Sequence, residues 1–111
     1  MSNAKAPLPG RKVRGSSHGR PIMAALDLLG RRWALRILWE LRQQPLGFRA
    51  LQGACDDMSS SVLRDRLGEL AEARIVDRDR DTYALSSLGV ELVNALAPLS
   101  EWSTRWADAI R

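Results

Sequence analysis

Two serines and an arginine near the middle of the chain have side chains that could contact DNA. Ser60, Ser61 and Arg64 follow Ser59, a good N-cap because its hydroxyl can accept a free backbone N–H in the first turn of a helix. Hydroxyls near a helix N-terminus can bond phosphates or base edges, and the helix dipole favours an anion there. An arginine one turn further on can reach a guanine edge. We therefore expect Ser59, Ser60, Ser61 and Arg64 to contact DNA, with an ordinary solvated helix face as the alternative.

Three further arginines are candidates for binding DNA phosphates. Arg49 lies in a short apolar segment before the serines, and Arg78 and Arg80 lie in a run of alternating charges that predicts a two-stranded ribbon with a tight tip. In an extended strand, Arg78 and Arg80 would share one face, and the other face would carry Asp77, Asp79 and Asp81. These aspartates would lower the attraction of the ribbon for DNA. The alternative for all three arginines is a surface ion pair, which contributes little to stability.

The spacing of apolar residues predicts the helices that must position these side chains. A first helix runs from Met23 to Leu29 and stops at Gly30, and a second ends before Pro45. The inward residues are Trp33, Ile37, Leu38 and Leu41 in the second helix and Phe48, Leu51 and Cys55 in a short third helix. After Ser59, a fourth helix has a buried stripe of Leu63, Leu67, Leu70 and Ala71.

Two short strands and a long helix complete the predicted fold. One strand begins at Ile75-Val76, residues 82–85 return, and Ser86-Ser87 cap a final helix that Pro98 should bend or divide. The order α-α-α-α-β-β-α predicts a mainly α winged helix-turn-helix domain with a small β-hairpin.

The final helix has more large apolar residues than a domain of this size can cover. They recur at steps of three or four, as Leu88, Leu92, Leu96, Leu99, Trp102, Trp106 and Ile110. An exposed apolar patch usually marks an interface, and aromatic residues are enriched in interface cores. We therefore expect a two-fold homodimer with an interface made of Ile22, Met23, Leu26, Leu99, Trp102, Trp106 and Ile110. The alternative is that this edge closes the core of the monomer.

Positive charge is concentrated at the start of the 111-residue chain. The formal net charge is +4, but residues 1–20 contain no acidic residue and five basic ones, Lys5, Arg11, Lys12, Arg14 and Arg20. Together with its prolines and glycines, this predicts a flexible basic arm over residues 1–20 and a folded DNA-binding and dimerisation domain over residues 21–111. The arm could attract phosphates. A solubilising tail is the alternative.

Several classes of function are not expected from the composition. No apolar run approaches the roughly 18 residues of a membrane span, and the N-terminus has no apolar signal segment. One cysteine, Cys55, excludes an internal disulfide and fits a reducing cytoplasm; we expect its thiol to be buried. No nucleophile–base pair or glycine-rich phosphate loop is visible, and His18 with Cys55 cannot complete a metal site. We therefore expect a cytoplasmic protein that is not an enzyme and needs no cofactor or metal ion.

Residues 20–106 contain a series of short motifs, each weak alone, whose order and spacing are specific. They are Pro21-Ile22, Ala25 to Trp33, Ile37-Leu38, Leu41, Phe48, Leu51, Met58-Ser59, Leu63, Leu67, Leu70, Ile75 to Arg78, Tyr83 to Ser86, Gly89, Leu92 and Trp102. Their order and spacing resemble the HxlR family of bacterial transcription regulators, winged-helix proteins close to the MarR type. The chain departs from that pattern in four places. Arg20 stands for the cysteine of a Cys-Pro, Arg31-Arg32 for a Gly-Lys, Gly47 for an arginine, and the proline-rich part of the wing is missing. Thiol sensing and insertion of the wing into a minor groove are therefore not carried over.

The resemblance implies a dimeric transcription factor that binds an operator in double-stranded DNA. It also implies a place for a small-molecule effector, if one acts, in the seam between the first and last helices. The alternative function is a winged-helix module that binds another protein and not DNA. The nearly neutral folded body and the aspartates of the ribbon motivate that alternative.

Overall fold

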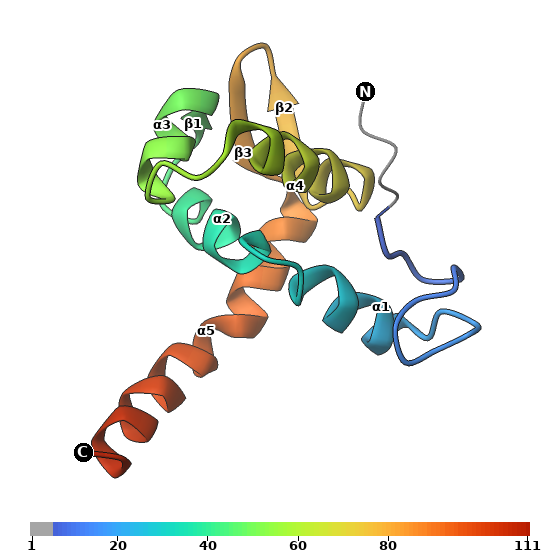
Figure 1. The fold of residues 1–111 in the computed structure, drawn as a ribbon, viewed down its shortest axis with the longest axis vertical. Coiled ribbons are helices and arrows are strands. Elements are labelled where there is room, and N and C mark those ends of the chain that lie inside the picture. Colours follow the sequence, from blue (N-terminus) through green and yellow to red (C-terminus); the bar gives the residue numbers. More distant parts are fainter. Residues whose placement is uncertain (1–5) are drawn as a thin grey trace.

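The computed structural model describes residues 6–111. Within them the chain forms five helices and three strands, confirming the mainly α winged helix-turn-helix fold (Figure 1). In chain order the elements are α1 (Pro21–Leu29), α2 (Ala34–Leu41), β1 (Leu46–Gly47), α3 (Phe48–Ala54), α4 (Ser60–Glu72), β2 (Val76–Asp79), β3 (Thr82–Leu85) and α5 (Ser87–Ala109). The predicted order lacks only β1.

The strand that was not predicted, β1, attaches α3 to the wing. The antiparallel sheet has the order β1-β3-β2, so β3 is its central strand. Tyr83 of β3 pairs with Leu46 of β1 on one side and with Arg78 of β2 on the other. Because α3 begins at Phe48, directly after β1, the sheet holds the start of this helix beside the β2–β3 hairpin.

The hairpin places Arg80 differently from the sequence prediction. β2 ends at Asp79, which pairs with Thr82, so Arg80 and Asp81 form the tip. Arg80 has a φ of 56°, in the left-handed region, and its backbone has left the extended conformation. The prediction that Arg78 and Arg80 share one strand face was therefore wrong. Alternation of side chains holds only while the backbone stays extended.

The core lies where α2, α3 and α4 meet the sheet. The predicted inward residues Ile37, Leu51, Leu63 and Leu70 are fully buried, and Leu67 is almost so. Burying a leucine or isoleucine side chain contributes about 1.5–3 kcal/mol. Cys55 is buried as predicted, whereas Ala71 is exposed and the prediction for it was wrong. The leucine stripe thus fixes which face of α4 remains at the surface.

The turn between α3 and α4 is held by Arg36 of α2. Its guanidinium donates to the Ala54 carbonyl oxygen at 2.7 Å and pairs with Asp56 at 3.3 Å and with Glu40 at 2.9 Å. Asp56 and Asp57 both have a positive φ, of 58° and 56°. Two successive left-handed residues reverse the chain within a short turn. Ser59 then caps α4 as predicted, because its hydroxyl accepts the Val62 N–H at 3.4 Å.

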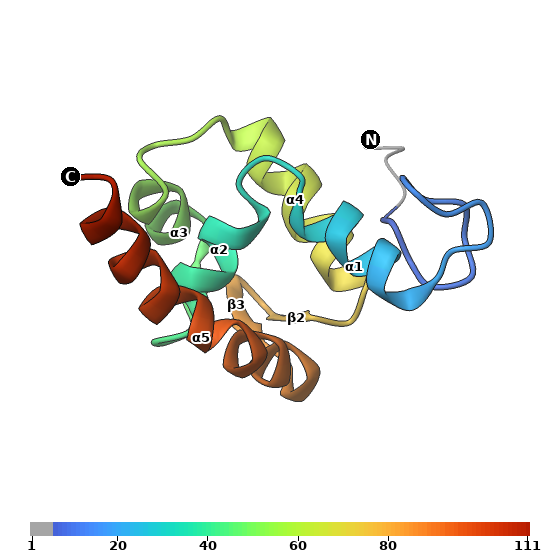
Figure 2. The same ribbon diagram turned by 90° about the horizontal axis from the view of Figure 1, so that it is seen from below.

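The long helix α5 is continuous through Pro98. Figure 2 shows its axis changing direction along its length, while Figure 1 shows its C-terminal end extending away from the rest of the domain. Pro98 therefore does not divide the helix. It removes one backbone donor, and a solvated helix tolerates this loss by bending.

The start of α5 lies directly against the base of the wing. The Ser86 hydroxyl donates to the Arg74 carbonyl oxygen at 2.6 Å, lies 3.0 Å from the Ile75 carbonyl oxygen, and accepts the Gly89 N–H at 3.0 Å. A Cβ atom at Gly89 would lie 2.2 Å from that same Ile75 oxygen. Glycine at this position is therefore required for α5 to approach β2 so closely.

Residues 6–20 form a loop that packs on α1 and α4. The Ala6 N–H donates to Glu72 at 2.8 Å, Arg11 pairs with Glu72 at 3.1 Å, and Val13 is buried. The basic composition did not predict these contacts, because they depend on single acceptors on distant helices. The division into an arm over 1–20 and a domain over 21–111 stays a prediction, and residues 1–5, with Lys5, lie outside the described part.

Candidate nucleic-acid interface

The first turns of α4 expose the side chains that the sequence singled out. Ser59, Ser60, Ser61 and Arg64 are all exposed, while Leu63 behind them is fully buried. The Ser59 hydroxyl is occupied by the helix cap and by the Ser61 hydroxyl at 2.9 Å. Ser60 is the hydroxyl of this group with no partner among residues 6–111. It is therefore the serine best placed to accept a new hydrogen bond.

A hollow of about 530 Å³ lies between α3, α4 and the wing. Its walls bring together three of the predicted arginines, Arg49 from α3, Arg64 from α4 and Arg78 from β2. None of the wing aspartates lines it. The acidic flank of the ribbon therefore does not cancel the charge inside the hollow.

Two aromatic rings support the arginines of this hollow. The guanidinium carbon of Arg64 lies 5.0 Å from the centroid of Phe48, and that of Arg78 lies 5.7 Å from the centroid of Tyr83. Arg78 also donates from Nε to the carbonyl oxygen of Arg80 at 2.9 Å. A cation over a ring face is stabilised by about 0.5–1 kcal/mol at exposed sites. The rings therefore limit the positions that the two guanidiniums can take.

The arginines of the hollow differ in their pairing from Arg36 and Arg66, which lie on the neighbouring parts of α2 and α4. Arg36 and Arg66 bind carboxylates within the domain, Arg66 through Glu69 at 3.0 Å. In the part of the chain that the structure describes, Arg49, Arg64 and Arg78 have no carboxylate partner. Their charge therefore remains available to an external anion. Arg80, at the hairpin tip, is exposed and lies outside the hollow.

Sequence reasoning missed the residues that shape this surface. Phe48 was assigned to the core and Tyr83 to a strand, and neither was considered as a support for arginine. Gly68 and Ala71 follow Arg64 at helical spacing, line the hollow and keep it open. A Cβ atom at Gly68 would meet nothing within 4 Å. Two small residues on the same helix face as Arg64 are the sequence signal that indicates an open surface beside this arginine.

The residues predicted for dimerisation belong to α1 and to the distal half of α5, which extend to different sides of the domain, away from the hairpin tip (Figure 1). Met23 is half-buried, and the other six are 48–70% exposed: Ile22, Leu26, Leu99, Trp102, Trp106 and Ile110. Trp102 and Trp106 stack on each other with 5.5 Å between their centroids. An apolar hollow of about 420 Å³ also lies between residues 7–9, α1 and the start of α5, and none of the seven predicted interface residues lines it.

The arrangement of α3, the turn, α4 and the β2–β3 hairpin defines a winged helix-turn-helix protein. This is the class in which the second helix of the motif presents side chains to a DNA groove. The chain belongs to the HxlR-like helix-turn-helix family, whose profile matches residues 28–111. The sequence resemblance to the HxlR family is thereby confirmed.

Three similar proteins illustrate the family relationship. The uncharacterized HTH-type transcriptional regulator YvaP of Bacillus subtilis is 33% identical over 91 residues, which cover 76% of this chain and 84% of YvaP. A putative MarR-family regulator of Enterococcus faecalis has a similar solved structure, with a TM-score of 0.72, 30% identity and coverage of 79% and 86% of the two chains. Quinone-bound YodB of B. subtilis gives a TM-score of 0.66 at 31% identity, with coverage of 79% and 96%.

The chain is a transcriptional regulator of the HxlR type and not an enzyme, as its family and relatives are regulators. Among residues 6–111, no helix combines the length and hydrophobicity that crossing a bilayer requires.

Proposed function

We propose that the protein binds a specific operator in double-stranded DNA as a homodimer, in the cytoplasm. The observation that carries the proposal is the hollow beside α4, where Arg49, Arg64 and Arg78 gather with no carboxylate partner among residues 6–111. In the described residues, α4 also exposes its serine-rich N-terminus next to this hollow. The side chains proposed to attract the DNA phosphates and those proposed to read the bases are thus adjacent.

Each group has a distinct part in the proposed contact. The N-terminal turns of α4 enter the major groove, where Ser60 and Ser61 bond base edges or phosphates and Arg64 reads a guanine edge. Arg49 and Arg78 contact phosphates on either side of the groove. Arg80, at the exposed tip, contacts the backbone from the wing. Ser59 contributes mainly by fixing the start of the helix, because its hydroxyl is already occupied.

The proposed dimer forms through α1 and the distal half of α5. Six of the seven predicted interface residues are exposed in the single chain, and two of them are stacked tryptophans. A seam with large aromatic side chains at its centre has the composition of stable interfaces. Two-fold symmetry would present two α4 helices to the half-sites of a palindrome.

The proposal is tested by selecting bound fragments from random DNA. We expect an enriched palindromic sequence, and binding to it that weakens steeply as salt is added, because phosphate contacts release counterions. Enrichment of one half-site only would contradict the dimer. Failure to enrich any sequence would contradict specific readout.

A protein-binding module is the second candidate function. The exposed aspartates at positions 77, 79 and 81 favour it, since an acidic wing edge would repel DNA. Gel shifts with genomic fragments at low salt distinguish the two functions. If no fragment is shifted, the result supports the protein-binding module and contradicts binding to an operator.

A further inference from the structure

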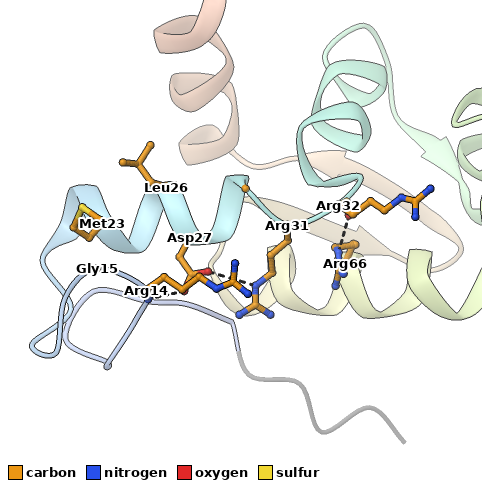
Figure 3. A pocket seen from close by; sticks show the side chains of 9 residues that line it. Arg14, Gly15, Met23, Leu26, Asp27, Arg31, Arg32 and Arg66 are labelled. Atoms are coloured by element: carbon orange, nitrogen blue, oxygen red, sulfur yellow. Dashed lines mark hydrogen bonds and ion pairs between the residues drawn. The ribbon is translucent and has the colours of Figure 1, made fainter.

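A second arginine-rich hollow lies away from the proposed DNA interface. It has a volume of about 650 Å³ and lies between the 14–15 loop, α1, the α1–α2 corner and α4 (Figure 3). Its lining includes four arginines, Arg14, Arg31, Arg32 and Arg66, and one carboxylate, Asp27. We propose that it is an oxyanion-binding site, which takes the phosphate or carboxylate group of a ligand between Arg14 and Arg31.

A buried carboxylate fixes two of these arginines in place. Glu69 of α4 is only 2% exposed, and it accepts hydrogen bonds from Arg31 and, at 3.0 Å, from Arg66. Arg66 also donates from Nε to the Arg32 carbonyl oxygen at 2.8 Å. Both guanidiniums are thus held at the wall of the hollow before any ligand arrives, which lowers the entropy cost of binding.

Arg14 is positioned by its backbone, which leaves its side chain available. Its N–H donates to Asp27 Oδ2 at 3.1 Å. The loop lies so close to α1 that a Cβ atom at Gly15 would be 2.2 Å from Met23 Cε. Within residues 6–111 the Arg14 guanidinium has no carboxylate partner of its own. Figure 3 shows the side chains of Arg14 and Arg31 reaching toward each other over Asp27.

The charge balance of the hollow favours an anion. The side chains of Arg14, Arg31 and Arg66 lie at the hollow with two carboxylates, Asp27 on the wall and Glu69 beneath it, which leaves a formal charge of +1. The Arg32 side chain points away from the hollow (Figure 3) and its guanidinium lies over the Trp33 ring. Two guanidiniums side by side repel each other, and a bound oxyanion would remove that repulsion. Guanidinium is also the side-chain group whose fork matches the oxygens of phosphate and carboxylate.

The hollow is separate from the proposed DNA interface. Arg66 follows Arg64 by two positions on α4, and residues two apart on a helix point in nearly opposite directions. The oxyanion can come from a DNA phosphodiester that passes this corner or from a free small molecule. The inference does not depend on the function proposed above, because the site is complete within one chain.

The test uses inorganic phosphate as the probe and thermal unfolding of the whole protein as the readout. Phosphate is compared with chloride at equal ionic strength for wild type, Arg14→Gln and the matched control Arg20→Gln. Arg20 is another exposed arginine of the same loop and does not line the hollow. We expect phosphate to raise the Tm of wild type and Arg20→Gln by roughly 3–6 °C, and that of Arg14→Gln by much less.

A further variant keeps the test independent of folding defects. Arg31→Lys retains a positive charge for Glu69 but loses the forked donor, so we expect a cooperative unfolding transition in chloride at a somewhat lower Tm, and a smaller rise of that Tm with phosphate than in wild type. Phosphate also stabilises proteins in general by exclusion from their surface. An equal rise of Tm in all four proteins would show only that effect and overturn the site, and so would no rise in any of them.

DNA binding by the same variants identifies the source of the oxyanion. If the source is a DNA phosphodiester, Arg14→Gln lowers the salt dependence of binding by about one counterion relative to Arg20→Gln. If the source is a free anion, the two variants bind DNA alike while their responses to phosphate still differ. If the wild-type protein does not bind DNA at all, the proposed function is contradicted, but the phosphate measurement still tests the oxyanion site.

Discussion

The guanidinium of Arg64 on α4 is stacked on the ring of Phe48 on α3, with 5.0 Å between the guanidinium carbon and the ring centroid. The two helices of the helix-turn-helix motif are thus joined through the residue proposed to read DNA. The ring restricts Arg64 without neutralising it. A carboxylate in place of the ring would hold the arginine equally well but would compete with a phosphate or a guanine.

Arg64→Ala should weaken binding to the selected operator roughly 10- to 100-fold, because a bidentate contact to guanine contributes about 1–3 kcal/mol of discrimination. Binding to random DNA should fall much less. Fluorescence anisotropy with both DNAs measures the ratio, and Arg42→Ala, an exposed arginine of the α2 terminus, is the control. Equal losses on both DNAs would show that Arg64 contacts only phosphates.

Phe48→Leu should lower operator affinity about two- to five-fold while leaving stability nearly unchanged. Leucine keeps most of the apolar volume but offers no ring face to Arg64, and a cation–π contact at such a site is worth about 0.5–1 kcal/mol. A double-mutant cycle with Arg64→Ala checks the mechanism. Strictly additive effects of the two substitutions would mean that Phe48 acts on binding by another route.

Trp106→Glu should convert the protein to a monomer and weaken operator binding strongly, because a charge would be buried in the proposed seam. Analytical ultracentrifugation measures the change. Val90→Glu is the matched control, since Val90 is exposed on the same helix but outside the predicted face. A monomeric wild type, or an unchanged dimer of Trp106→Glu, would refute the assigned interface.

Glu69→Ala should destabilise the fold by about 3 kcal/mol or more. Glu69 is buried and binds both Arg31 and Arg66, and removing one partner of a buried ion pair leaves the others uncompensated. Urea denaturation compares it with Glu91→Ala, an exposed glutamate of α5. If Glu69→Ala lowers the free energy of unfolding no more than Glu91→Ala does, solvent must screen the ion pairs of Glu69.

Burial raises the pKa of the Cys55 thiol, and Arg36 opposes this only in part. The folded protein therefore keeps the thiol proton at a pH where the unfolded chain has lost it. Since the raised pKa belongs to the folded state, stability should fall as the pH rises from about 8.5, the ordinary thiol value, toward the raised one. Denaturation at several pH values would show this, and Cys55→Ala should remove the dependence. Iodoacetamide should modify the native thiol slowly.

The sequence predicts those parts of the fold whose signal repeats locally. Leu63, Leu67 and Leu70 mark the inner face of α4 by their spacing, and the Ser59 and Ser86 caps mark where two helices begin. β1 could not be predicted, because two residues show no alternation and their pairing with Tyr83 is distant in the chain.

The candidate site was predictable only as a set of residue types. The sequence indicated Arg49, Arg64 and Arg78, but their meeting in one hollow depends on the packing of α3 and the wing around α4. The position of Arg80 depends on where the hairpin turns, because β2 ends at Asp79 and a strand one residue longer would have included Arg80. The docking of residues 6–20 depended on Glu72 and Asp27, which offer acceptors far along the chain.

The absence of a side chain at Gly89 has a mechanical consequence. The last helix and the root of the hairpin are in close contact at Ile75, so a rotation of the start of the helix would displace the hairpin as well. In the proposed dimer, a tilt that the partner subunit imposes on the projecting end of α5 would reach the arginine-bearing strand as far as the helix transmits it past Pro98. If the wing contacts DNA as proposed, a change at the tryptophans would then alter the affinity for DNA.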